Sequence, residues 1–194
     1  MNIIFDIGNV LVSYEPLAYL RNMFPDMDNN LTNSLFFGIF QSPEWALMDQ
    51  GLLTQQEACT IFCQRRPEHQ QEIRQAMAHL DDIFTPKTAT VNLLPRIKKA
   101  GHSLYYLSNI HRETRDFLLR AHGYFNLFDG GVFSCDVNIN KPAPGIYRAL
   151  LQKYGLSPQD CVFFDDVEAN VAAARAEGIN AVCFTNAECV EPYI

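Results

Sequence analysis

Hydrophobic residues follow two different patterns along this chain, and the change of pattern divides it into parts. Short apolar runs typical of buried strands occur at five places: residues 1–5, 104–107, 131–134, 161–164 and 181–184. Apolar residues at helical spacing follow three of these runs, around residues 113–121, 145–154 and 168–177. Repeated strand–helix units predict right-handed crossovers and one parallel sheet, which is a Rossmann-like α/β fold.

The stretch at residues 16–86 has only the helical pattern, and strand signals are absent from it. Thr54 and Glu57 have the spacing of a capping box that opens a helix. We therefore predict a helical insert at 16–86 between two parts of an α/β core, 1–15 and 87–194. The usual role of aromatic residues is burial, so we expect packing from those of the insert: Phe36, Phe37, Phe40 and Trp45.

Composition is that of a globular protein, with 48% hydrophobic and 19% charged residues in 194. A net charge of -7 argues against nucleic acid as the main partner. The apolar runs fall short of the ~20 residues that span a bilayer, so we expect no membrane association. Met1 lies so close to the first strand that we expect no signal peptide and a cytoplasmic location.

The six cysteines form no Cys-x-x-Cys pair, and no histidine stands at zinc-ligand spacing beside them. Cys161 and Cys183 lie in apolar runs, where a free thiol behaves as a small hydrophobic group. Reduced thiols agree with the expected cytoplasmic location.

Polar residues stand where the predicted strands end, and this is where an open α/β sheet binds ligands. Asp6 ends the first strand, and a carboxylate at the tip of a buried strand is costly unless it meets a cation, donors or a substrate. Ser108 and Asn109 end the second strand, Lys141 lies in a proline-stiffened loop, and Asp165-Asp166 ends the strand at 161–164. Each has an ordinary explanation alone, as a turn residue, a helix cap or a solvated charge.

In this order, the Asp, the Ser, the Lys and the Asp-Asp pair resemble the four motifs of the haloacid dehalogenase (HAD) superfamily of hydrolases. The runs FDIGNVL at 5–11 and FFDDVEANV at 163–171 are similar to a subgroup that includes bacterial α-D-glucose-1-phosphate phosphatases. The resemblance extends from residue 2 to about residue 184 and is weakest in the insert. It implies a HAD-like core in which the insert at 16–86 is a small cap over the site.

The resemblance implies a phosphatase in which Asp6 is the nucleophile and forms an aspartyl-phosphate intermediate. It also implies Mg²⁺, held by Asp6, the backbone carbonyl of Gly8 and Asp166. A cation is needed because a carboxylate that attacks a phosphate dianion meets like-charge repulsion, and Mg²⁺ prefers oxygen ligands.

The remaining motif residues are expected around the phosphate and the metal. Lys141 and Ser108 are expected to contact the phosphate, together with Asn109. Asp165 is expected next to the metal ligands, where it acts through them or through a bound water. Asn170, one helical turn after Asp166, is expected to face the site.

Two positions depart from the family pattern. Most HAD phosphatases carry a second Asp two residues after the nucleophile as general acid and base, and here that residue is Gly8. General acid–base catalysis contributes ~10²–10⁴-fold, so leaving groups that need little protonation, such as a sugar 1-phosphate or an acyl phosphate, should suffer least. The second departure is Asn170, where many relatives have a carboxylate.

Several neighbouring side chains are weaker candidates for a part in the reaction. Substitutes for the missing acid include Ser13, Tyr14 and Glu15, which follow the first strand. In the insert, Trp45 and Asp49 are candidates for substrate contacts. His111 is expected at the surface or at a helix start rather than in catalysis.

The leading hypothesis is therefore a Mg²⁺-dependent phosphatase of a small phosphorylated metabolite, such as a sugar phosphate. We expect the protein to be a monomer or a weak homo-oligomer. One alternative is a dehalogenase in which Asp6 attacks carbon without a metal; the Asp165-Asp166 pair weighs against it. The other is a catalytically weak binding or regulatory protein, which Gly8 and Asn170 would explain.

Overall fold

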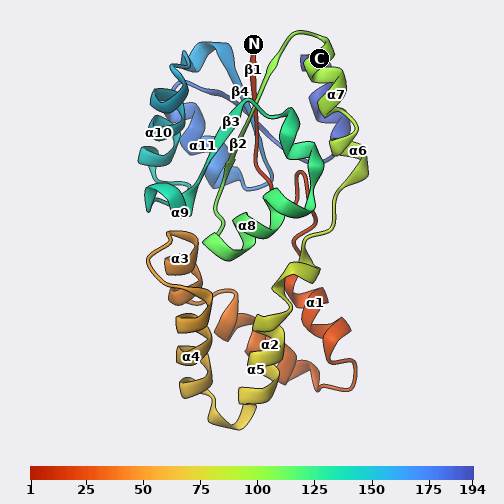
Figure 1. The fold of residues 1–194 in the computed structure, drawn as a ribbon, viewed down its shortest axis with the longest axis vertical. Helices are drawn as coiled ribbons and strands as arrows, with labels where there is room; N and C mark the ends of the chain where they lie inside the picture. Colours follow the sequence, from red (N-terminus) through yellow and green to blue (C-terminus); the bar gives the residue numbers. More distant parts are fainter.

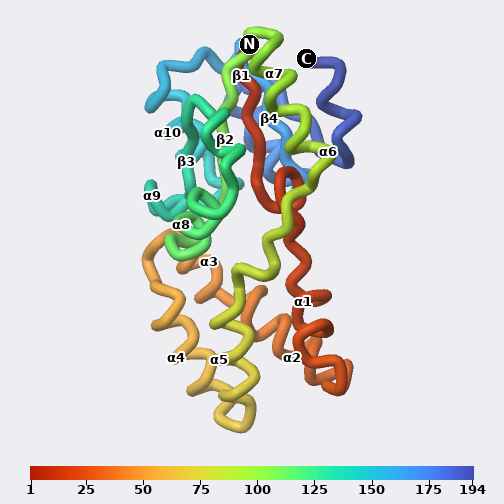
Figure 2. The backbone as a smooth tube through the Cα atoms, turned by 45° about the vertical axis from the view of Figure 1, so that its right-hand side comes forward, coloured from red at the N-terminus to blue at the C-terminus, as the bar shows by residue number.

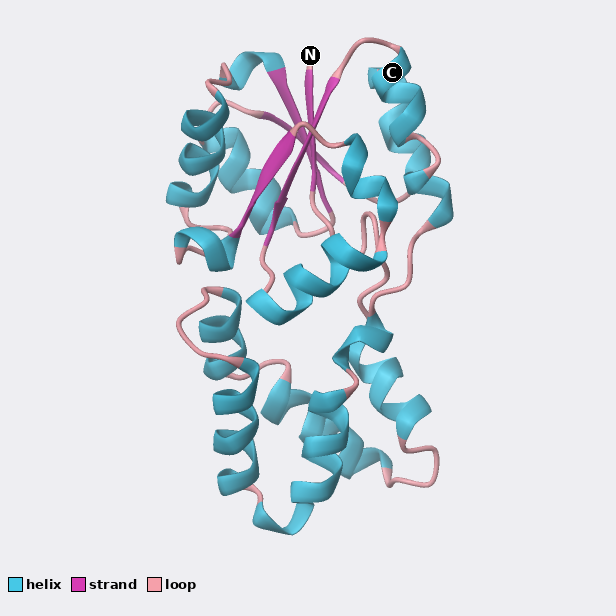
Figure 3. Ribbon diagram, viewed as in Figure 1, coloured by secondary structure: helices cyan, strands magenta, loops and turns pink.

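The computed structural model describes all residues, 1–194, and its centre is a parallel sheet of five strands in the order β3-β2-β1-β4-β5. The strands are β1 (Asn2–Phe5), β2 (Ser103–Ser108), β3 (Gly130–Phe133), β4 (Cys161–Asp165) and β5 (Asn180–Cys183). All five predicted strands are present, each shifted by at most one residue at its start, and the α/β fold class is confirmed. Figure 3 shows the strands together in one half of the molecule.

The central strand β1 is buried on both faces of the sheet. Ile3 and Phe5 belong to a large hydrophobic cluster on one face, whereas Ile4 belongs to a smaller cluster on the other face. This division follows from the strand geometry, in which successive side chains point to opposite faces. Strands covered on both faces are continuous apolar runs, which is the pattern found in the sequence.

Helices of the core cover both faces of the sheet and follow the strands as predicted (Figure 1). They are α6 (Thr88–Val91), α7 (Leu94–Lys99), α8 (Arg112–Ala121), α9 (Ser134–Val137), α10 (Pro144–Tyr154) and α11 (Glu168–Ala176). Gly101, Gly155 and Gly178 stand where helices end and have φ of 84°, 62° and 82°. Glycine adopts this left-handed conformation without strain, which explains why glycine stands at these helix ends.

The segment that was predicted as an insert is helical throughout and lies at the opposite end of the molecule from both termini (Figure 1). Its helices are α1 (Pro16–Met23), α2 (Asn29–Ile39), α3 (Pro43–Asp49), α4 (Gln55–Arg65) and α5 (Gln70–Ala78). The predicted capping box opens α4, since the Thr54 hydroxyl accepts from the Glu57 N–H and the Glu57 carboxylate accepts from the Thr54 N–H. Short 3-10 helices occur at Pro67–His69, Leu80–Ile83, Gly123–Leu127, Pro158–Asp160 and Ala187–Tyr193.

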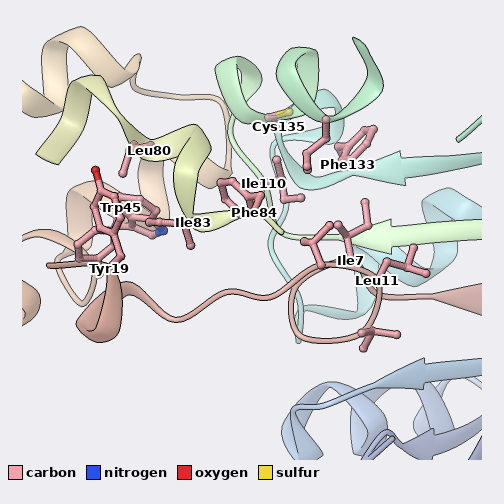
Figure 4. Packing of buried hydrophobic residues seen from close by; sticks show 14 of the residues in the cluster. Ile7, Leu11, Tyr19, Trp45, Leu80, Ile83, Phe84, Ile110, Phe133 and Cys135 are labelled. Atoms are coloured by element: carbon pink, nitrogen blue, oxygen red, sulfur yellow. The ribbon is translucent and has the colours of Figure 1, made fainter. Parts of the chain in front are cut away.

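Two extended segments join the helical cap to the core and run side by side (Figure 2). The N–H of Ser13 donates to the carbonyl of Thr85 at 2.7 Å, and the N–H of Lys87 donates to the carbonyl of Leu11 at 2.8 Å. The large hydrophobic cluster continues through this connection, as Figure 4 shows for Ile7 on the core side and Phe84 on the cap side. The cap and the core therefore share one apolar interior.

The cap also contacts the core through the C-terminal half of α3. Three core side chains donate to its carbonyls: Ser134 to Asp49, Asn138 to Gln50 at 2.6 Å, and Asn140 to Ala46 at 2.9 Å. The carbonyls of Asp49 and Gln50 lie at the helix end and lack partners within the helix, so the core supplies their donors, whereas the Ala46 carbonyl also accepts from the Gln50 N–H. As a result, α3 is held directly over the edge of the sheet.

Other predictions about the chain can be compared with the structure. All six cysteines are free thiols. No helix combines the length and apolar character that crossing a bilayer requires. Of the insert's aromatic residues, Phe40 and Trp45 are buried, whereas Phe37 is 64% exposed, so the expectation of packing is wrong for Phe37.

Candidate active site

A cavity of about 450 Å³ lies between the carboxyl edge of the sheet and the cap. It is at the point where the strand order changes direction, between β1 and β4, and ligands of open α/β sheets bind at such points. The cavity brings together seven of the eight predicted site residues: Asp6, Gly8, Ser108, Asn109, Lys141, Asp166 and Asn170. Asp165, the eighth, is fully buried beside them.

Asp6 follows β1 directly and is 7% exposed. Its Oδ1 accepts from the Ser108 hydroxyl at 2.6 Å, the Lys141 ammonium at 2.8 Å and the N–H of Ile7 at 2.7 Å. Burial raises the pKa of Asp6 to about 6, against the opposing effect of Lys141. Its other oxygen, Oδ2, has no protein donor in this network and is open to a cation.

Lys141 is 5% exposed and connects the first and fourth motifs. Its ammonium lies 2.8 Å from Asp6 and 2.6 Å from Asp165, and these carboxylates keep its pKa above the usual range despite the opposing effect of burial. The Asn109 side chain fixes the backbone of Lys141, accepting from its N–H at 2.7 Å and donating to its carbonyl at 3.0 Å. Asn109 therefore positions the lysine, and because its NH₂ group has a second hydrogen and it lines the cavity, the expected contact with the phosphate stays a prediction.

Asp165 ends β4 with both carboxylate oxygens occupied. Besides Lys141, it accepts from the N–H of Val167 at 2.8 Å and from the Asn170 amide at 3.0 and 3.1 Å. Asn170 lies on the first turn of α11, and its amide is directed at Asp165. An amide at this position is a donor to Asp165, a role that a carboxylate could not take without a proton.

Asp166 is the more exposed member of the acid pair. Its carboxylate accepts one bond, from the Asn9 side chain at 3.1 Å. Asn9 has φ of 56° and also accepts from the N–H of Tyr14 at 2.9 Å, so it joins the first motif loop to the fourth. We missed Asn9 in the sequence, although an Asn after a glycine is a signal for a left-handed residue.

The acids fit a metal ion. Asp6, Asp165 and Asp166 each offer an oxygen, and these three atoms lie within 4.8 Å of one another. Because Asp165 already accepts several bonds, the free oxygens of Asp6 and Asp166 are the ones left for a cation. An all-oxygen set with few carboxylates and open space for water is what Mg²⁺ prefers.

Position 8 has room for a side chain. A Cβ added to Gly8 would meet no atom closer than the Cβ of Tyr14, at 3.8 Å. Of the three residues considered as substitute acids, Tyr14 lines the cavity, whereas Ser13 and Glu15 line a separate hollow beside α1. Ser13 and Glu15 are therefore excluded as substitutes for the missing acid.

His111 was expected at the surface or at a helix start, and the first of these expectations is wrong. It is the N-cap residue of α8, but it is only 2% exposed and lines the cavity. Its Nδ1 faces Asp49 of α3 at 3.6 Å, its Nε2 lies 2.9 Å from the Thr114 hydroxyl, and Trp45 packs edge-on against its ring. Pairing across the cap and the core carries no local sequence signal, so only the fold could reveal it.

The comparison with known families agrees with this geometry. A model of the haloacid dehalogenase-like hydrolases matches residues 1–178. The chain belongs to this family.

Relatives of this HAD hydrolase include phosphatases. Sesquiterpene phosphatase astK from Aspergillus oryzae is 25% identical over 190 residues, which cover 97% of this chain and 92% of astK. Fructose-1-phosphate phosphatase YqaB from Escherichia coli is 40% identical over 65 residues, which cover 33% of this chain and 35% of YqaB. Among solved structures, a HAD family enzyme from Bacteroides thetaiotaomicron, an aspartate-to-alanine mutant with magnesium and inorganic phosphate, has a TM-score of 0.78 at 19% identity over 95% of this chain and 94% of its own.

Proposed function

We propose that this HAD hydrolase is a magnesium-dependent phosphatase that acts on a small phosphorylated metabolite, a sugar 1-phosphate, through an aspartyl-phosphate on Asp6. The observation that carries the proposal is the setting of Asp6, whose carboxylate opens into the cavity with Lys141 and Ser108 in hydrogen-bond contact. This is the constellation that phosphoryl transfer requires, namely a nucleophile surrounded by groups that neutralise the phosphate.

Each side chain has a defined part in the reaction. Asp6 attacks phosphorus, and the oxygens of the phosphoryl group take the donors that Lys141 and Ser108 now give to Asp6. Asp165 and Asn109 hold Lys141 by its ammonium and its backbone, so the positive charge is in place before the substrate arrives. Donors that are already oriented stabilise developing charge without reorganisation in the reaction.

Magnesium would be held by Asp6, the Gly8 carbonyl and Asp166, and when bound it supplies positive charge to the transferring group. The proximity of the Asp6 and Asp166 carboxylates supports these two ligands, and the Gly8 carbonyl follows from the family resemblance alone. The acid pair also argues against a metal-free dehalogenase, in which the negative charge of Asp166 would lie near Asp6 with no cation to balance it.

A sugar phosphate is favoured over a terpenyl phosphate, although a relative is a sesquiterpene phosphatase. The part of the cavity beneath the cap contains Gln41, Asp49 and His111 beside the aromatic residues. Desolvating such groups against a hydrocarbon is costly, whereas the hydroxyl groups of a sugar can bond to them. The phosphate is placed on the anomeric oxygen, a leaving group that depends little on protonation, because position 8 carries no acid directly beside the leaving oxygen.

The test is a phosphate-release screen over sugar, acyl and nucleotide phosphates with Mg²⁺, run beside Asp6→Asn. We expect release from a sugar 1-phosphate, faster than from the 6-phosphate of the same sugar, and no release with Asp6→Asn or with EDTA. Activity of Asp6→Asn would remove the proposed nucleophile. Phosphate release that persists in EDTA would remove the magnesium requirement, and halide release from a haloacid in EDTA would favour the dehalogenase. Binding of sugar phosphates without any turnover would favour a binding protein.

A further inference from the structure

The proposed reaction leaves one proton unassigned. When the bond between phosphorus and the leaving oxygen breaks, an alcohol needs a proton, and the residue that usually supplies it is replaced by Gly8. Any substitute must line the same cavity, on the side where the leaving group lies, beneath the cap. Tyr14, Asp49 and His111 are the titratable residues there.

These three residues are successive neighbours along the cavity wall, beginning next to position 8. The Cβ of Tyr14 is the atom nearest to the place of a Gly8 Cβ. Burial, and then the nearby Asp49 carboxylate, raise the pKa of Tyr14 above its usual range, so the phenol stays neutral and is a poor acid. Asp49 lies beyond it, with its side chain 15% exposed, and faces Nδ1 of His111 at 3.6 Å.

The position of Asp49 is fixed from both sides. Its own backbone carbonyl accepts from the Ser134 hydroxyl of the core, and the neighbouring α3 carbonyls accept from Asn138 and Asn140. His111 is held by Thr114 through Nε2, which leaves Nδ1 to face the carboxylate. A buried carboxyl beside an imidazole is a common arrangement for proton transfer, because the imidazole stabilises the carboxylate that forms.

We propose that Asp49 is the general acid and base of the reaction, in place of the side chain that position 8 lacks, and that His111 is its positioning residue. The inference rests on the proposed phosphatase function. Burial raises the pKa of Asp49, against the opposing effect of His111, which favours a carboxyl that can hold a proton.

The proton balance follows in two steps. In the first step, the bond from Asp6 to phosphorus forms, the bond from phosphorus to the leaving oxygen breaks, and the Asp49 proton passes to that oxygen. In the second step, water attacks phosphorus, the bond to Asp6 breaks, and the proton of the water passes to the Asp49 carboxylate. Asp6 and Asp49 are thus restored.

The test uses two phosphates of similar size, p-nitrophenyl phosphate, whose leaving group needs no proton, and p-nitrobenzyl phosphate, whose alcohol does. The measured quantity is kcat/KM with Mg²⁺, which includes departure of the leaving group. Asp49→Asn should lower kcat/KM for the benzyl ester by ~10²-fold or more and change that for the phenyl ester little. His111→Gln should shift the same ratio in the same direction by less, and Asp26→Asn, an exposed cap carboxylate, is the matched control.

A rescue separates catalysis from cap structure. Since position 8 has room for a side chain, Gly8→Asp in the Asp49→Asn background should restore turnover of the benzyl ester. An equal loss for both esters, a wild type without activity on the benzyl ester, or a selective loss in Tyr14→Phe instead of Asp49→Asn would overturn the role of Asp49. A wild type inactive on both esters and on every phosphate screened would instead remove the phosphatase proposal itself.

Discussion

At the scale of single residues, the site is a buried cluster of charges with an excess of carboxylates. Lys141 balances one of the two acids that it contacts, and Asp166 lies beside them. Buried charges are tolerated only when they are paired or bind an ion. The sequence revealed the carboxylates because they stand at the ends of strands, whereas Lys141 was identified by its place in the order of the family motifs.

The first prediction concerns the metal-free protein and Asp6. The pKa of about 6 in the folded protein lies above the usual value of 3.8, so between these pH values the folded state binds more protons than the unfolded state. The contribution of Asp6 to folding stability is fully present below pH 3.8 and is lost as the pH rises through 6. Above pH 6 the ionised carboxylate lowers the free energy of unfolding by up to about 3 kcal/mol. In EDTA, Asp6→Asn should raise the free energy of unfolding by ~1–3 kcal/mol at pH 8 and much less at pH 4.

Urea unfolding at the two pH values measures this difference, with Asp26→Asn as the control. A gain that is the same at both pH values would contradict the assignment of the shift to Asp6.

The second prediction concerns Asn109, which holds the backbone of Lys141. Asn109→Ala removes both bonds and should cost ~1–3 kcal/mol of stability. It should also lower kcat on the best substrate about tenfold or more, because the lysine is no longer oriented. Thermal unfolding and steady-state kinetics measure the two effects, and a normal kcat in Asn109→Ala would show that the lysine loop needs no such support.

At the scale of elements, the contact of α3 with the core decides whether the cap residues reach the cavity. Gly51 follows α3 with φ of 67°, and a Cβ there would lie 2.6 Å from the carbonyl oxygen of Cys135. Both the conformation and the close approach require glycine. The helical pattern predicted α3 as part of a helical segment, but the three bonds from the core to its carbonyls come from residues about 90 positions away.

The third prediction follows from this contact. Gly51→Ala should displace α3 and raise KM for the best substrate, with a loss of stability of ~1–3 kcal/mol from backbone strain. Gly123→Ala is the matched control, since a Cβ at that position meets no atom within 4 Å and φ is not positive. Unchanged KM and stability in Gly51→Ala would mean that the cap tolerates a wider separation from the core.

At the scale of the whole molecule, one apolar cluster runs from the sheet through the connection into the cap (Figure 4). We expect the cap and the core to unfold together, and a ligand at their junction should stabilise both. Mg²⁺ at 100 times its Kd should raise the free energy of unfolding by about 2.7 kcal/mol. A thermal scan with and without Mg²⁺ measures this, and Asp166→Asn should lose the effect. Equal stabilisation of wild type and Asp166→Asn would place the ion elsewhere.

The sequence by itself determined the strands, the helices that follow them, the helical insert and the residues at the strand ends. Alternation, helical spacing and glycine at helix ends are local properties, so they can be read without the fold. Asp6, Ser108 and the Asp165-Asp166 pair stand at the ends of apolar runs, and together with Lys141 they were recognised by their order, which resembles the family motifs.

Only the tertiary structure decided which groups these residues contact and which further residues line the site. Asn109 holds the backbone of Lys141, and Asn9 joins two motif loops. His111 stands at a helix start, one of the two places expected, but its ring is buried in the cavity wall, opposite Asp49 of the cap. These relations depend on contacts between residues far apart in the chain, and such contacts are set by the packing of the cap on the sheet, which leaves no periodic pattern in the sequence.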